Sequence, residues 1–278
     1  MEQILKENTN NIKKQEKELI KYFKELGITV NTRTKARGHQ GFFLKNRIDI
    51  SRTVSENRII PTLLHEFAHY IHFQIEPKMN LTGGSFTELF GEENEVFQKE
   101  LFKVTNFVDE NSLCVKLYEH KDRIKEKINE LENIIKEDYP YFMRSKPFKE
   151  FDRYIKKSEA RYLLKYDRVR IVTGFWKKSS KLITVSTIEQ DFPQMPKSFA
   201  AYIRLKSAQK KQSRISARIN KLNKYYTKPN ELFARFIEGL YLDKDWVKAL
   251  APYTTKKFYE KLNEGKYKNL ETVVYKYL

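Results

Sequence analysis

Apolar residues recur every three or four positions along most of this chain, a spacing typical of amphipathic α-helices. One such segment covers residues 3–26 and stops at Gly27, and another covers residues 86–107 after the Gly83–Gly84 pair. Short helices are expected around Trp246, Phe258 and Val273, with Pro252 and Gly265 between them. The pattern therefore predicts a largely helical protein.

A stretch of alternating apolar residues interrupts this helical pattern. Residues 41–44 and 47–51 read as two strands joined at Lys45–Asn46, which predicts a tight antiparallel hairpin. A strand beside a helix either binds an extended peptide by backbone pairing or serves as an ordinary cap on a helical core. With these strands, the sequence predicts an α+β fold: a mostly helical core with a small antiparallel sheet.

Two long helices in the second half of the chain share an apolar repeat. On a helix from about Ser112 to Asp138 the repeat is Ile124, Ile128, Leu131 and Ile135, and later it is Ile215, Ile219, Leu222 and Tyr226. Two such stripes predict an antiparallel helix pair, in which acidic residues of the first helix offset the basic second one.

The same region contains two strand-like runs, residues 168–172 and 182–185, with Ser179–Ser180 near the turn. We interpret residues 111–221 as an inserted helical and β lobe. Residues 1–110 then form the first part of the core, and residues 222–278 complete it. The alternative is that the lobe is woven into one continuous core.

The sequence His65-Glu66-Phe67-Ala68-His69 lies inside an apolar, helix-periodic segment. Two histidines four residues apart share one helix face, so both imidazoles can reach one metal ion. Glu66 points about 100° away, which suits a carboxylate that holds metal-bound water. The pattern predicts a catalytic Zn²⁺ site. The alternative is a pair of core histidines bonded to the backbone, with Glu66 at the surface.

A catalytic zinc ion needs a third protein ligand. His72 continues the histidine stripe but lies about 4.5 Å further along the axis, which favours a place in the cleft wall. Other downstream candidates are Glu88, Glu92, Glu93, Glu95 and His120. Glu231 is favoured, because Pro229 and Asn230 open a strongly apolar helix there and Ala234 permits close helix packing. A glutamate in a first helical turn otherwise serves as a partner of the helix dipole.

The segment Pro229–Glu238, Pro-x-Glu-Leu-Phe-Ala-Arg-x-x-Glu, follows a tyrosine pair. It resembles the second motif of zincin-like domains in the polyvalent proteins of phages and mobile elements. It is similar, more loosely, to the E-x-x-A helix of gluzincin peptidases. The resemblance implies that His65, His69 and Glu231 bind zinc and that Glu66 is the general base of a metallopeptidase acting on a protein or peptide. Glu231 follows His69 at a far greater distance than in gluzincins, so either a lobe is inserted or another glutamate is the ligand.

Tyr225 and Tyr226 stand just before the Glu231 helix. A phenolic O–H there is suited to stabilising the oxyanion that develops during peptide hydrolysis. Plain packing of the two rings is the alternative.

The chain carries 54 basic and 36 acidic residues, a formal net charge of +18. Residues 192–230 contain no Asp or Glu, and their cations suit phosphate groups beside the active site. These are Lys197, Arg204, Lys206, Lys210, Lys211, Arg214, Arg218, Lys221, Lys224 and Lys228. A solvated helix face is the alternative. A second functional hypothesis is therefore a nucleic-acid-associated protein of a mobile element that uses a zincin scaffold.

A single cysteine, Cys114, excludes an internal disulfide and favours a reducing compartment. The first 30 residues contain no apolar run, and no stretch approaches the ~18 apolar residues that a transmembrane helix needs. We expect a cytoplasmic protein without a membrane partner.

Overall fold

The computed structural model describes residues 2–35, 40–173, 179–191, 193 and 195–278. The fold is α+β and mostly helical, as predicted. The chain separates into two compact units. Unit 1 contains residues 1–113 and 223–278, and unit 2 contains residues 114–222, next to the limits expected for the inserted lobe.

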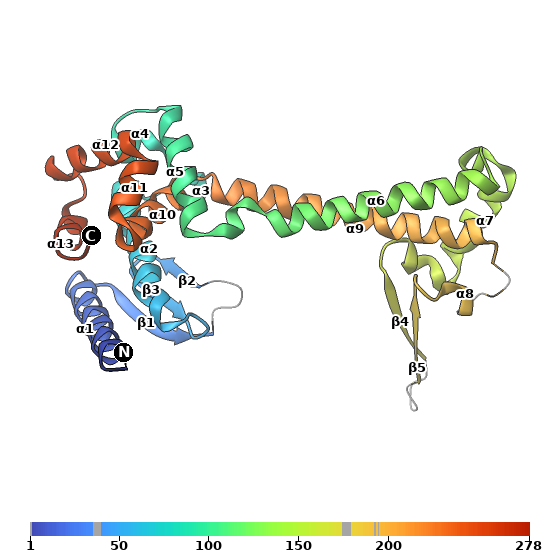
Figure 1. The fold of residues 1–278 in the computed structure, drawn as a ribbon, viewed down its shortest axis with the longest axis horizontal. Coiled ribbons are helices and arrows are strands. Elements are labelled where there is room, and N and C mark those ends of the chain that lie inside the picture. Colours follow the sequence, from blue (N-terminus) through green and yellow to red (C-terminus); the bar gives the residue numbers. More distant parts are fainter. Residues whose placement is uncertain (1, 36–39, 174–178, 192, 194) are drawn as a thin grey trace. The chain divides into compact units, whose positions relative to one another are not determined.

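Unit 1 combines a helical core with a small sheet (Figure 1). Its first part contains α1 (Glu2–Glu25), β1 (Thr29–Thr34), β2 (Gly41–Leu44), β3 (Arg47–Ser51), α2 (Glu56–Ile75), α3 (Met79–Thr82), α4 (Phe86–Phe90), α5 (Glu95–Val108) and the 3₁₀ helix η1 (Glu110–Leu113). Its second part contains α10 (Pro229–Leu242), α11 (Lys244–Leu250), α12 (Pro252–Asn263) and α13 (Lys268–Tyr277).

The sheet has the strand order β1-β3-β2. β2 pairs antiparallel with β3 from Gly41↔Ile50 to Leu44↔Arg47, which confirms the predicted hairpin. β1 pairs parallel with β3, so the sheet is mixed and not purely antiparallel. β2 is therefore an edge strand, and it packs beside α2.

Residues 86–107 are largely helical, as the pattern predicted, but two helices occupy this segment. α4 ends at Gly91, whose φ of 87° is left-handed and suits glycine. α5 begins after Asn94, whose side chain accepts a hydrogen bond from the Val96 N–H at 2.9 Å. A C-terminal glycine and a new N-cap thus break the apolar repeat into two helices.

The core of unit 1 forms where α10 packs against α2 and α5. α2 contributes the predicted apolar surface, with Leu63, Leu64, Phe67 and Ala68 fully buried. Gly239 lets α10 approach α5, since a Cβ atom there would lie 2.9 Å from Val104 Cγ1. This packing fixes α2 and α10 beside each other, so the candidate ligands lie on two rigid and adjacent helices.

Unit 2 contains α6 (Val115–Asp138), η2 (Phe142–Arg144), α7 (Lys146–Lys157), η3 (Glu159–Leu164), β4 (Arg168–Thr173), β5 (Ser179–Thr184), α8 (Ile188–Asp191) and α9 (Lys197–Tyr226) up to residue 222. α6 starts three residues after Ser112, because Cys114 adopts a left-handed φ of 52° and η1 precedes it. The predicted strand runs pair antiparallel as β4 and β5. Ser179–Ser180 open β5, and residues 174–178 before them lie outside the described residues.

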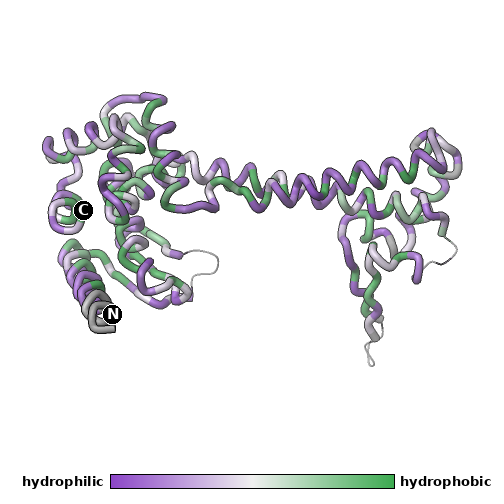
Figure 2. The backbone as a smooth tube through the Cα atoms, in the orientation of Figure 1, coloured by the Kyte–Doolittle hydropathy of each residue, from purple (hydrophilic) through white to green (hydrophobic). Residues whose placement is uncertain are grey.

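α6 and α9 lie side by side (Figure 1), as the apolar repeats predicted. A single hydrophobic cluster joins Ile124, Ile128, Leu131 and Ile135 of α6 to Leu205, Ala208, Ile215 and Ile219 of α9. Figure 2 shows that hydrophilic residues dominate both helices, so their apolar contact is a narrow stripe. The core cluster of unit 1 shares no residue with the two clusters of unit 2, which excludes one continuous core among the described residues.

Among the described residues, no helix combines the length and the apolar character that a bilayer-spanning segment needs.

Candidate metal centre

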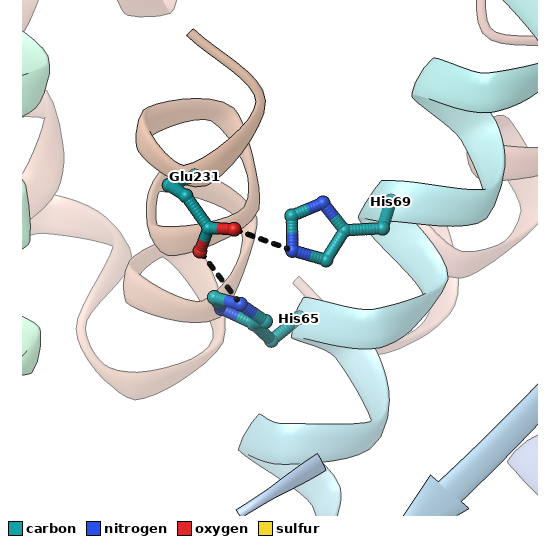
Figure 3. A group of neighbouring side chains, drawn as sticks. All are labelled: His65, His69 and Glu231. Atoms are coloured by element: carbon teal, nitrogen blue, oxygen red, sulfur yellow. Dashed lines mark ion pairs between the residues drawn. The ribbon is translucent and has the colours of Figure 1, made fainter. Parts of the chain in front are cut away.

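Two helices of unit 1 bring together the side chains that the sequence singled out. His65, Glu66 and His69 lie in the middle of α2, and Glu231 lies in the first turn of α10. Figure 3 shows both imidazoles pointing toward the Glu231 carboxylate. The start of α10 is fixed by the N–H of Asn230, which donates to the Gly83 carbonyl at 2.9 Å.

The distances within this group fit ligands of one ion better than they fit hydrogen bonds. His65 Nε2 lies 3.7 Å from Glu231 Oε2, and His69 Nε2 lies 3.6 Å from Glu231 Oε1. Both separations exceed the range of an N–H···O hydrogen bond. Two ligands at zinc-bond lengths in a tetrahedral site lie about 3.4 Å apart. One ligand atom from each residue falls within 4.8 Å of the others, so the three donors converge on one point.

Burial makes this convergence costly without a cation. His65, His69 and Glu231 are all buried, and Glu231 Oε2 has no hydrogen-bond partner among the described residues. A buried carboxylate oxygen without a partner destabilises a fold by about 1–3 kcal/mol. A divalent cation between the three donors would satisfy that oxygen, so the residues present fit a metal ion.

Glu238 lies two helical turns after Glu231 on the same face of α10, and it orients the first histidine, His65. Its Oε2 lies 3.1 Å from His65 Nδ1 and 2.9 Å from an Arg235 nitrogen, and its Oε1 lies 2.6 Å from an Arg58 nitrogen. A hydrogen on Nδ1 directed at Glu238 leaves the Nε2 lone pair of His65 free for a metal. Sequence reasoning assigned Glu238 no role, although its place two turns after Glu231 on the same face was a usable signal.

The two tyrosines before α10 have different surroundings. The hydroxyl of Tyr226 donates to Asp109 Oδ2 at 2.9 Å, and Arg235 contacts the same oxygen at 3.2 Å. The Tyr225 hydroxyl instead lies near Glu231, and burial together with that carboxylate raises the pKa of its phenol. Tyr225 therefore belongs to the metal-site cluster, whereas Tyr226 supports Arg235 through Asp109.

Glu66 is buried, which excludes the alternative with this carboxylate at the surface. Burial, with a contribution from Glu231, raises the pKa of Glu66 to about 7, although the His65 charge opposes the rise. Gly41 of the edge strand lies directly against this side chain, since a Cβ atom there would approach Glu66 Oε1 to 2.5 Å. The strand therefore fixes the carboxylate on one side.

The pKa values of the two histidines shift in opposite directions. Burial and the Arg235 charge disfavour protonation of His65, but the nearby carboxylates of Glu231 and Glu238 prevail and raise its pKa to about 9. Burial lowers the pKa of His69 to about 4. The two shifts therefore run in opposite directions, although both rings face the same Glu231 carboxylate.

The other candidate ligands lie elsewhere. His72 is fully buried with its Nε2 3.3 Å from Glu76 Oε2, so it belongs to the helix packing beside Phe233. Glu88, Glu93 and Glu95 are exposed, Glu92 accepts the Tyr253 hydroxyl at 2.6 Å, and His120 lies in unit 2. Of the predicted candidates, Glu231 is the one that meets both histidines.

No protein family model, curated protein or solved structure matches this chain.

Proposed function

We propose that the protein is a zinc-dependent metallopeptidase of the zincin-like type, in which His65, His69 and Glu231 hold the ion and Glu66 is the general base. One observation carries the proposal: the Glu231 carboxylate lies beside the His65 and His69 imidazoles, although all of unit 2 separates them in the sequence. A glutamate that serves only as a dipole partner has no reason to face two buried imidazoles.

The chemistry of the donor set supports zinc. Two imidazoles and one carboxylate are a familiar set for catalytic zinc, with the fourth position left for water or substrate. When bound, zinc supplies a Lewis acid that polarises the scissile carbonyl and lowers the pKa of bound water to roughly 7. His65 contributes a fixed Nε2 donor, because Glu238, Arg58 and Arg235 lock its orientation.

The remaining residues supply proton transfer and charge stabilisation. Glu66, held against Gly41, takes the proton from the attacking water and returns it to the leaving amine. The phenol of Tyr225, near Glu231, donates to the developing oxyanion. The edge strand β2 adjoins Glu66 and offers free backbone groups for an extended peptide.

The proposal is tested with the purified full chain after dialysis against zinc. We expect about one zinc per chain by elemental analysis in the wild type and in Glu66→Gln, and peptide hydrolysis in the wild type alone. His69→Ala should lose both metal and activity. Glu264→Gln, an exposed glutamate on the C-terminal side of α12, is the matched control and should behave as wild type. Substoichiometric zinc in both wild type and Glu66→Gln would contradict the proposal.

A further inference from the structure

The positive charge of this protein is concentrated in unit 2. Residues 114–222 contain 27 basic and 13 acidic residues, whereas the remaining residues contain 27 basic and 23 acidic ones. Unit 2 therefore carries +14 of the total charge of +18. A charge of this size on so short a segment attracts polyanions over long range.

Much of this charge lies on one face of α9, which contains no Asp or Glu. Lys206, Lys210, Arg214, Arg218 and Lys221 follow one another at intervals of three or four residues. They form a basic stripe about 22 Å long, from a rise of 1.5 Å per residue. The stripe faces away from Ile215 and Ile219, which pack on α6, and its members are exposed except the half-buried Lys206.

The acidic residues of α6 do not neutralise this stripe, contrary to the expected charge offset between the two helices. In the described part of unit 2, no ion pair joins α6 to α9. The ion pairs of α9, Arg204 with Glu189 and Lys211 with Asp167, involve cations outside the stripe. Arg214 of the stripe donates to the Lys165 carbonyl and lies 4.9 Å from the centre of the Tyr166 ring. Lys210, Arg218 and Lys221 are exposed and form no ion pair among the described residues, so they are available to an external anion.

A cavity of about 530 Å³ adjoins the stripe at Lys206. Its lining includes Tyr139, Tyr141, Tyr202, Lys136, Arg144 and Lys206. The Lys206 ammonium lies 5.3 Å from the centre of the Tyr202 ring, and Tyr141 is 76% exposed. Aromatic rings beside cations are what an unpaired nucleobase with its phosphate requires, whereas a paired base cannot enter such a cavity.

We infer that unit 2 binds single-stranded nucleic acid, with phosphates along the basic stripe and an unstacked base in the aromatic cavity. The inference does not depend on the metal centre, which lies in unit 1. Binding by the cations of the stripe and one stacking site is sequence-tolerant, so the ligand class is defined by strandedness and not by base order.

The first experiment measures binding of the full chain to a fluorescent 20-nucleotide oligo-dT strand and to a duplex of equal length. We expect tighter binding to the single strand, with a slope of log K against log salt of about −2 to −3.5 for three to five phosphate contacts. Tighter or equal binding to the duplex would overturn the inference, as would no binding to either probe at low salt.

The second experiment locates the surface. The variant Lys210→Glu/Arg218→Glu/Lys221→Glu should weaken binding by roughly tenfold or more and flatten the salt slope. The matched control changes the net charge equally at three exposed lysines of α1, Lys17→Glu/Lys21→Glu/Lys24→Glu, and should bind nearly as the wild type does. An equal loss of affinity in both variants would mean that net charge alone attracts the nucleic acid, and it would overturn the assignment of the basic stripe as the binding surface.

The cavity has its own test. Tyr141→Ala removes an exposed ring and should weaken binding about five-fold or more without changing the salt slope, since stacking is not electrostatic. Tyr154→Ala is the control, because this ring is 61% exposed and lies outside the cavity. If Tyr141→Ala binds as tightly as Tyr154→Ala, the base is not held in the cavity.

Discussion

Glu238 shows how one buried carboxylate can organise a candidate metal site without touching the ion. It is 1% exposed and accepts from two arginines while fixing Nδ1 of His65. A histidine ligand depends on such a partner for its tautomer and ring orientation. Burial raises the pKa of Glu238, but the hydrogen bond and charge of His65, helped by the charges of Arg235 and Arg58, prevail and hold this pKa low.

On the proposed function, Glu238→Gln should weaken zinc binding by roughly 10–100-fold. The amide keeps the shape but loses the charge that His65 and both arginines need. A competition titration with a chromophoric chelator measures the affinity, and a thermal melt with saturating zinc checks that the variant folds. An affinity equal to that of the wild type would remove the orienting role of Glu238.

Asp109 gives a prediction for stability against pH. Burial raises its pKa, but Arg235 and the Tyr226 hydroxyl prevail and hold the pKa below its usual value of about 3.9. Its contribution is therefore complete above pH 3.9 and is lost as the pH falls through the lower folded-state pKa. Asp109→Asn should unfold at lower urea concentration than the wild type at pH 7, and the difference should shrink progressively as the pH falls below the usual aspartate pKa of about 3.9. Urea unfolding is followed by circular dichroism. Equal unfolding midpoints for Asp109→Asn and the wild type at pH 7 would contradict this prediction.

At the scale of elements, the contact between β2 and α2 places a strand edge against the candidate base. Gly41→Ala is acceptable to the backbone, but its Cβ atom would lie 2.5 Å from Glu66 Oε1 and displace the carboxylate. On the proposed function, hydrolysis should fall by roughly tenfold or more while zinc stoichiometry stays unchanged. The measurements are peptide turnover and elemental analysis, and full activity would show that Glu66 need not stay where β2 holds it.

Sequence periodicity predicted the elements that bury an apolar face. Apolar residues recur at regular spacing in the α2 segment, the β2–β3 hairpin and the α6–α9 pair, because each of these elements buries one face away from water. β1 was missed because Thr29–Thr34 is mostly exposed and polar, so no alternation of apolar residues marks it. Its parallel pairing with β3 uses backbone hydrogen bonds and polar side chains, since Asn31 donates to Asp49 and Thr34 donates to the Ile50 carbonyl. The candidate metal ligands His65, His69 and Glu231 could be singled out from residue type and spacing, and the structure brings them together. The contact of Glu238 with His65 depends instead on how α10 and α2 face each other.

At the scale of the whole molecule, separate hydrophobic clusters predict separate unfolding. On the proposed function, the zinc ligands belong to helices of unit 1 that contribute to its cluster, and none of them belongs to unit 2. A ligand stabilises the unit that binds it by mass action. Calorimetry should therefore show two transitions, of which only one moves to lower temperature when zinc is removed by a chelator. A single transition, or an equal shift of both, would contradict independent units.

The order of the ligands along the chain has a consequence during synthesis. His65 and His69 leave the ribosome early, but Glu231 follows only after all of unit 2 has been made. A growing or prematurely terminated polypeptide thus carries two imidazoles and lacks the carboxylate that completes the set. On the proposed function, a chain interrupted before Glu231 cannot cut its neighbours, and proteolytic competence arises only after unit 2 and the start of α10 have been made.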